Sequence, residues 1–281
     1  MTHGTTALPA ALAPYVSAVV PYDVDMGAPG VHRGLPGTAL TFELPLDEPI
    51  DVAWAGQEAT RRRAWSCVSG LHTRPAAIHH GGRQRGVSIA LTFRGARALL
   101  GVPAGELAGE LVSLPEVAPR LAHLPEQLAA SPGPATVVRA LAGELAAADP
   151  PAPRPGVGRA LARIAAGHQV RQVADEQGWS RRHLQDLVRA ECGLVPRDLR
   201  RVARLARSRH ALVAAARSGR AVLADVAAAA GYADHAHMTR EWVTLGGCTP
   251  STWLLEELPF VQDVAAPPGT SWEASDHGGT P

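Results

Sequence analysis

Residues 170–196 read VRQVADEQGWSRRHLQDLVRAECGLVP, and residues 223–253 read LADVAAAAGYADHAHMTREWVTLGGCTPSTW. Each stretch has a short amphipathic segment, a turn that begins with glycine (Gly178, Gly231) and a second segment with polar residues on one side. Glycine adopts a positive φ without penalty, so it ends the first helix. Ser180 and Asp234 then stand at the N-cap of the second helix. The pattern predicts two helix-turn-helix units, an arrangement typical of DNA-reading proteins.

The second helix of the first unit, predicted to begin after Ser180, has an apolar side of Leu184, Leu187 and Val188. Its other side presents Arg181, Arg182, Gln185, Asp186 and Arg189. Arginine bonds bidentately to guanine and glutamine to adenine in the major groove. We predict base contacts for Arg182 and Gln185, which lie in the first turn and a half of the helix, and phosphate contacts for Arg181 and Arg189. A merely solvated polar face is the alternative, and it would be preferred for an isolated helix.

In the second unit, Val222, Val226, Ala227 and Ala230 are predicted to be buried ahead of the turn. After Asp234, the core is predicted to take Met238, Trp242, Val243 and Leu245. The remaining polar set is His235, His237, Thr239 and Arg240. His235 and Thr239 lie one turn apart and are predicted to contact bases or sugars, whereas Arg240 suits a phosphate. His235 and His237, two residues apart, diverge on a helix and do not form a metal pair.

Between the units, residues 196–218 predict one long helix with proline in its first turn, where a missing N–H is tolerated. The predicted buried stripe is Leu199, Val202, Ala206, Leu212 and Val213. The arginines at 200, 201, 204 and 207 project elsewhere and are predicted to reach the DNA backbone. A short helix at 158–167 is predicted to pack behind the first unit. The long helix would thus hold two reading units at a fixed separation.

Charge divides the chain unevenly, although the net charge is only +1. All 27 cations are arginine, and residues 157–260 carry 15 of them against 10 acidic residues. An excess of base in one half suggests a polyanionic partner for that half, but taken alone an excess of this size is better explained by a solvated basic face. The three cysteines are far apart and lack CxxC spacing, which argues against disulfides and structural zinc. The sequence shows no signal peptide and no run of roughly 18 apolar residues, so we expect a cytoplasmic protein without a membrane span.

The first half has the pattern of a small β-barrel or sandwich of cupin-like type, followed by helices. Short strands are predicted at 38–44, 50–54, 64–71, 76–79 and 86–93, with a weaker indication at 14–20. Arg61, Arg62 and Arg63 are predicted to form a solvated turn. Helices are predicted at 95–100, 103–107, 115–129 and 135–148. The fold class is therefore α+β multidomain: a β-rich domain at 1–148, a Pro-rich linker at 149–157, the helix-turn-helix domain at 158–258 and a disordered acidic tail at 259–281.

Side chains on or near these strands suggest a pocket for a small molecule. The predicted lining residues are Trp65, His72, Arg74, His79 and Arg85. A β-domain used only for dimerisation or protein contacts is the alternative. The histidines at 32, 72, 79 and 80 lack the spacing and carboxylates of a metal site, so no metal and no cofactor is predicted.

Residues 158–253 resemble the DNA-binding domain of the AraC/XylS family of bacterial transcription regulators. The residues that carry the resemblance are Ala174, Gly178, Ser180, Leu184, Gly193, Pro196, Arg204 and Leu205, then 224–227, 231–234, His237, Met238, Arg240, Trp242, Gly247, Thr249 and Pro250. Leu187 and Met238 stand where the family usually has phenylalanine, and Asp186 replaces a commonly basic or polar residue. The segments 32–37, 69–76 and 86–107 are similar to the N-terminal domain of some AraC-like proteins. The resemblance implies two units that occupy successive major grooves on one face of DNA.

A sequence-specific transcription regulator is therefore the leading interpretation, with double-stranded DNA as its partner. This interpretation leaves three further partners open: a small-molecule effector, RNA polymerase and a second copy of the chain bound through the N-terminal domain. The rival is an enzyme or DNA-repair protein with an AraC-like appendage, because some repair alkyltransferases join such a unit to reactive cysteines. Cys67 lacks neighbouring cysteine or histidine residues that would activate it, so we predict no catalytic residues. A DNA-binding structural protein without regulation is a third alternative.

Overall fold

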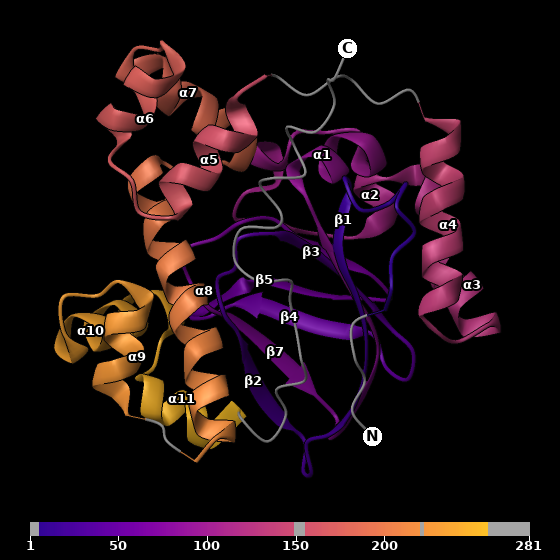
Figure 1. Ribbon diagram of the computed structural model, residues 1–281. Helices are drawn as coiled ribbons and strands as arrows, with labels where there is room; N and C mark the ends of the chain where they lie inside the picture. The colour runs from indigo at the N-terminus through magenta and orange to yellow at the C-terminus, as the bar shows by residue number, and fades with distance from the viewer. Residues whose placement is uncertain (1–5, 149–154, 220–221, 258–281) are drawn as a thin grey trace.

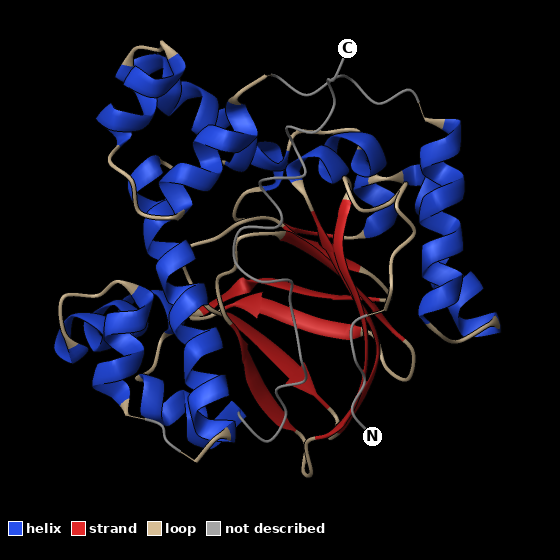
Figure 2. Cartoon of the chain, viewed as in Figure 1, coloured by secondary structure: helices blue, strands red, loops and turns tan. Residues whose placement is uncertain are grey.

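The computed structural model describes residues 6–148, 155–219 and 222–257. The first part contains two antiparallel sheets beside helices, and the second part is helical (Figures 1 and 2). The strands are β1 (Val16–Asp25), β2 (Gly30–Gly34), β3 (Leu40–Pro45), β4 (Ile50–Trp54), β5 (Gln57–Ala64), β6 (Cys67–Ser69), β7 (Ala76–His80), β8 (Arg83–Leu91) and β9 (Leu111–Val112). They form one sheet in the order β1-β8-β3-β6-β9 and another in the order β2-β7-β4-β5. The predicted fold class is confirmed.

One face of the five-stranded sheet makes the main core of the first part. Phe42 on β3 lies opposite Ile89 on β8, and both are fully buried. Because side chains alternate along a strand, their neighbours point to the other face, toward the four-stranded sheet. The helices of this part are short except the last: α1 (Phe93–Gly95), η1 (Ala96–Leu100), η2 (Ala104–Leu107), α2 (Leu114–Val117), η3 (Pro119–Leu121), α3 (Leu124–Ala130) and α4 (Pro134–Ala147).

Two sequence predictions for the first part are wrong. Residues 61–63 lie within β5, where Arg61 makes two hydrogen bonds to the Asp51 carboxylate on β4, of 2.7 and 2.9 Å. β5 is an edge strand, so its charged side chains stay in solvent while the backbone pairs with β4. The helix predicted at 115–129 is three separate segments, because Pro115, Pro119 and Pro125 each stand at the start of a new one.

The second part contains α5 (Val157–Ala165), α6 (Val170–Gln177), α7 (Arg181–Cys192), α8 (Pro196–Arg217), α9 (Leu223–Ala230), α10 (His235–Gly246) and α11 (Pro250–Glu257). The long helix α8 carries α6 and α7 near one end and α9 and α10 near the other, with the sheets beside it (Figure 1). None of the described helices is both long and apolar enough to cross a bilayer. The Pro-rich segment 149–154 and the tail after residue 257 lie outside the described residues.

The apolar clusters do not follow the division of the chain into a β-rich part and a helical part. Buried residues in and next to the first helix-turn-helix unit belong to the same cluster as Phe42 and Leu141 of the first part; they include Leu161 of α5, Val188 of α7 and Leu199 of α8. The second unit has a separate core around Trp242, whose Nε1 donates to Ser208 Oγ of α8 at 2.9 Å. The first unit therefore shares its core with the β-rich part, whereas the second unit has a core of its own, against which Leu35 of the β-rich part packs.

Candidate nucleic-acid interface and internal cavity

The first helix-turn-helix unit has the predicted local geometry. Gly178 ends α6 with a φ of 69°, and Ser180 Oγ accepts a hydrogen bond from His183 N at 3.1 Å. Leu184, Leu187 and Val188 are buried as predicted. The polar residues on the other side of α7 are all exposed: Arg181, Arg182, Gln185, Asp186 and Arg189. The start of α7 therefore presents a guanidinium and an amide to solvent, the chemistry that reads base edges.

The second unit repeats this geometry. Gly231 ends α9 with a φ of 83°, and Asp234 Oδ1 accepts from His237 N at 2.6 Å. His235 and Arg240 are exposed, as a contact with DNA requires.

Two members of the polar set in the second unit are partly buried. The His237 ring packs edge-on against Tyr232, with centroids 5.3 Å apart, and Thr239 Oγ1 is buried with no hydrogen-bond partner among the described residues. The predicted base or sugar contact by Thr239 is therefore not available in this conformation. Val222 and Val243 were also expected in the core, yet they are 52% and 49% exposed. Both lie at the edge of a helix that has only one packed side.

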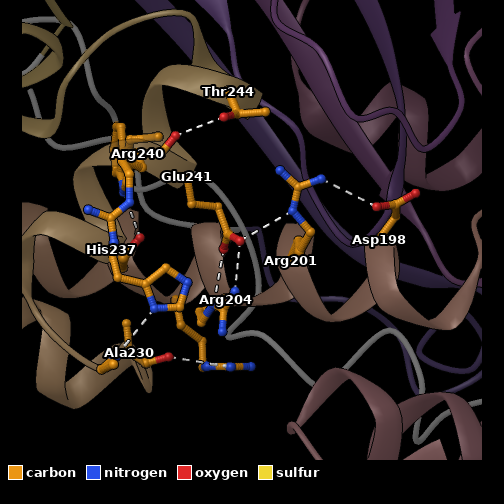
Figure 3. A network of polar contacts seen from close by, with 12 residues as sticks. Asp198, Arg201, Arg204, Ala230, His237, Arg240, Glu241 and Thr244 are labelled. Carbon is orange, nitrogen blue, oxygen red and sulfur yellow. Dashed lines mark hydrogen bonds and ion pairs between the residues drawn. The ribbon is translucent and has the colours of Figure 1, made fainter.

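The α8 arginines make internal contacts, which corrects the prediction that they face DNA. Arg204 donates Nε and Nη2 to the Glu241 carboxylate of α10 at 3.0 and 2.7 Å, and Arg201 Nε donates to it at 3.2 Å. Figure 3 shows Glu241 between these two guanidinium groups. Arg207 donates to the carbonyl oxygens of Ala165 and Ala230 at 2.7 and 3.5 Å. These contacts join α8 to α5, α9 and α10, so three of the four arginines that were predicted to reach the DNA backbone, at 201, 204 and 207, make internal contacts.

A cavity of about 630 Å³ lies between the two sheets and reaches α8 and α11. On β3 it is lined by Thr41, Glu43 and Pro45, which alternate with the buried Leu40, Phe42 and Leu44. Its walls are otherwise largely apolar, with Val20, Val52 and Ile78 among the lining residues. Ala206, Arg209 and Val213 of α8 lie three and four residues apart and line it from the helix. The helix that joins the two reading units thus forms one wall of the cavity.

Arg209 and Glu43 are ionisable groups of the cavity lining without a charged partner among the described residues. Arg209 has neither a hydrogen bond nor an ion pair there, and burial lowers the pKa of its guanidinium. Glu43 accepts one hydrogen bond, from Ser88 Oγ at 2.6 Å, and burial raises its pKa to about 7. An enclosed charge without a partner is destabilising. Each group is therefore better satisfied when a ligand with complementary chemistry fills the cavity.

Comparison with known proteins agrees with this arrangement. Residues 173–256 match the family described as a helix-turn-helix domain, over both predicted units. The chain carries an AraC-type helix-turn-helix domain. By this domain, it is a DNA-binding transcription regulator. No curated protein matches it in sequence.

Solved structures with a similar fold include ToxT from Vibrio cholerae, at 11% identity and a TM-score of 0.54, covering 85% of this chain and 98% of that one. A ToxT structure with bound unsaturated fatty acid has 10% identity and a TM-score of 0.50, covering 89% and 98%. ToxT bound to (E)-4-(8-methylnaphthalen-1-yl)but-3-enoic acid has 9% identity and a TM-score of 0.50, covering 85% and 98%. At these identities, the likeness establishes the fold alone.

Of the residues predicted to form a pocket, His72 and Arg85 line the cavity that faces the AraC-type domain. Arg74 instead stacks over Trp54, 5.5 Å from the ring centroid, and donates to Gln57 Oε1 at 2.8 Å. Trp65 is 50% exposed. His79 neighbours the cavity-lining Ile78 on β7, so its side chain points to the opposite face of the sheet. These three residues are not brought to the cavity.

His72 is held at the cavity wall by its neighbours. Its Nδ1 lies 2.6 Å from the Arg74 carbonyl oxygen, its ring centroid is 4.7 Å from that of Trp54, and burial lowers its pKa to about 4.

The sequence analysis assigned the arginines at 200, 201, 204 and 207 and made no prediction for Arg209. A signal was present in the sequence: position 209 lies three residues after Ala206 and four before Val213, both predicted to be buried. An arginine on an otherwise apolar stripe of a helix indicates either a buried pair or a polar ligand.

The AraC-type domain contacts the β-rich part at both ends. Gly105 of η2 lies so close to α7 that a Cβ there would come within 2.4 Å of the Ala190 carbonyl oxygen. At the other end, Arg33 N of β2 donates to Glu257 Oε1 of α11 at 2.9 Å. His32 Nδ1 lies 3.8 Å from Glu257 Oε2, and burial lowers the pKa of His32 to about 4. The β-rich part therefore contacts the helical domain both at α7 and at α11.

The thiols have the properties of buried side chains. All three cysteines are free and buried, and burial raises the pKa of Cys67 and of Cys192 to about 12. A thiol with such a pKa is almost entirely protonated at neutral pH, whereas a reactive cysteine is a thiolate. Within the described ranges, no three His, Cys, Asp or Glu side chains gather as a metal site would require.

Proposed function

We propose that the chain is a sequence-specific transcription regulator whose two units read adjacent major-groove segments under the control of a small anionic effector. The observation that carries this proposal is the position of α8. This helix joins two capped helix-turn-helix units with exposed polar faces. It also lines the cavity with a guanidinium, that of Arg209, which has no partner in the described part of the chain. A ligand that binds Arg209 would therefore act on the element that sets the relation between the two units.

On DNA, Arg182 and Gln185 at the start of α7 are proposed to contact bases, with His235 in the same role on α10. Arg181, Arg189 and Arg240 are proposed to contact phosphates, which would make the affinity fall as salt rises. Ser180 and Asp234 contribute as N-caps that hold the two reading helices, and the buried Thr239 hydroxyl is left out. Binding to RNA polymerase and dimerisation through the N-terminal domain remain predictions that rest on the family resemblance and the domain organisation.

For the effector, the proposal is a molecule with an apolar body and a carboxylate. The cavity volume lies within the usual range of roughly 300–1,000 Å³ for small-molecule sites. Apolar walls would take the body, and Arg209 would take the carboxylate. The similarly folded ToxT binds an unsaturated fatty acid and a naphthalenyl butenoic acid, which supports this ligand class.

Substitutions in the two reading helices test the DNA-binding proposal. Arg182→Ala is expected to weaken binding to the selected site by about 1–3 kcal/mol and to relax preference at one base pair, because a bidentate base contact is lost. Arg240→Ala is expected to weaken binding to cognate and random duplexes equally, because a phosphate contact carries no sequence information. Affinities on both duplexes at fixed salt give the comparison. Equal losses on the two duplexes for Arg182→Ala would contradict its role in base readout.

A further inference from the structure

The cavity contains a second polar end, formed by Glu43. Glu43 lies on the strand face that lines the cavity, between Thr41 and Pro45. Its single hydrogen bond among the described residues comes from Ser88 Oγ to Oε1. No arginine or histidine of the described chain pairs with it. The carboxylate therefore keeps free acceptor positions that only a molecule inside the cavity can use.

The surroundings of Glu43 favour a hydroxyl rather than a cation as its partner. The lining side chains around it carry hydroxyls, on Tyr22, Thr41 and Ser88. Burial raises the pKa of Tyr22 above its usual value, and the nearby charge of Glu43 raises it further. Burial also raises the pKa of Glu43 to about 7, so the carboxylate and the neutral acid are about equally populated at neutral pH. A neutral hydroxyl donates to this group without bringing a second charge out of water.

Glu43 and Arg209 belong to different elements, and no hydrogen bond or ion pair joins them. Glu43 lies in the wall made by β3, and Arg209 lies in the wall made by α8. The groups thus offer one acceptor and one cationic donor in a single cavity whose intervening walls are largely apolar. A ligand with only one polar end satisfies one of them and leaves the other unpartnered.

We propose that the effector is an amphiphilic hydroxy acid, whose carboxylate binds Arg209 and whose remote hydroxyl donates to Glu43. This inference rests on the proposed function, in which the cavity is the effector site. It narrows the ligand class from apolar carboxylates to those with a hydrogen-bond donor distant from the carboxylate. It also assigns specificity to a residue in the β-rich part, separate from the arginine that contacts the ligand through α8.

Calorimetric titration of the full chain with two matched series tests the proposal. One series is the ω-hydroxyalkanoates of 8, 10, 12 and 14 carbons, and the other is the unsubstituted alkanoates of the same lengths. At the best-fitting length, the hydroxy acid is expected to bind about tenfold more tightly, the size of one hydrogen bond to a buried charged group. Glu43→Met is expected to reduce the difference to less than twofold, and Asp175→Ala, at an exposed position of α6 that does not line the cavity, is expected to preserve it. Circular dichroism of each variant checks that the fold is kept.

The outcomes separate the two proposals. If alkanoates bind as tightly as their hydroxy partners at every length, and Arg209→Met weakens both, the role of Glu43 is wrong and the effector cavity stands. If Glu43→Met leaves a tenfold preference intact, the hydroxyl lies elsewhere and the inference is also overturned. If neither series binds, or binding is indifferent to Arg209→Met, the effector proposal itself is wrong and this inference is lost with it.

Discussion

Glu241→Ala is expected to lower the free energy of unfolding of the second helix-turn-helix unit by about 3 kcal/mol, the lower end of the range for breaking a buried pair. Glu241 is 6% exposed and accepts hydrogen bonds from both Arg201 and Arg204. Without it, two largely enclosed guanidinium groups on α8 lose their counter-charge. The contact that fixes α10 relative to α8 is lost at the same time, so binding to the longer DNA site should fall as well.

Urea unfolding followed by tryptophan fluorescence measures this effect, because Trp242 and Trp253 both lie in the core of the second unit. Asp175→Ala is the matched control, since its ion pair with Arg171 spans 3.9 Å and both side chains are at least 70% exposed. An exposed pair contributes only about 0–1 kcal/mol, so the control should unfold nearly as the wild type does. Equal midpoints for Glu241→Ala and Asp175→Ala would show that Glu241 does not fasten the second unit.

Arg209→Met is expected to act in opposite directions on ligand binding and on stability. The ligand-free protein should become more thermally stable, because an enclosed charge without a counter-ion is replaced by an apolar chain of similar length. Affinity for a monounsaturated fatty acid such as oleate should fall about 10- to 150-fold, the equivalent of about 1.5–3 kcal/mol for hydrogen bonds to a charged group. Thermal unfolding with and without oleate, together with calorimetric titration, measures both effects.

Arg85→Met is the control for that experiment. Arg85 lines the same cavity, but its guanidinium donates to Asp47 Oδ1 at 2.7 and 3.2 Å. Its removal is expected to change oleate affinity by less than twofold. If the two variants weaken oleate equally, or if Arg209→Met destabilises the ligand-free protein, Arg209 is not the carboxylate partner.

Local signals in the sequence were sufficient for the helix-turn-helix units. A glycine with positive φ and a side-chain N-cap are properties of a few adjacent residues, so Gly178, Ser180, Gly231 and Asp234 predicted their turns correctly. The 3.6-residue spacing likewise placed Leu184, Val188, Met238 and Trp242 in the core.

The incorrect predictions concern side chains whose partners lie on other helices or strands. Arg201 and Arg204 look like a solvated basic face until α10 brings Glu241 against them. Arg61 looks like part of a turn until Asp51 on the neighbouring strand binds it.

A pocket near the strands was predicted, but most of its lining could not be, for a different reason. Alternation along β3 shows that Glu43 and Phe42 point to opposite faces, but it does not show what fills the space beyond each face. Only the packing of helices on the Phe42 side, and the separation of the two sheets on the Glu43 side, distinguishes a core from a hollow interior.

A hydroxyl-radical footprint tests most directly whether both helix-turn-helix units bind DNA together. The full chain would first select sites from a random duplex pool, and the selected site would then be footprinted with the wild type and with Arg240→Ala. We expect two protected segments on one face of the duplex, one helical turn or about 10 base pairs apart, with protection of one segment weakened in the variant. A single protected segment that is the same in both proteins would contradict binding by both units.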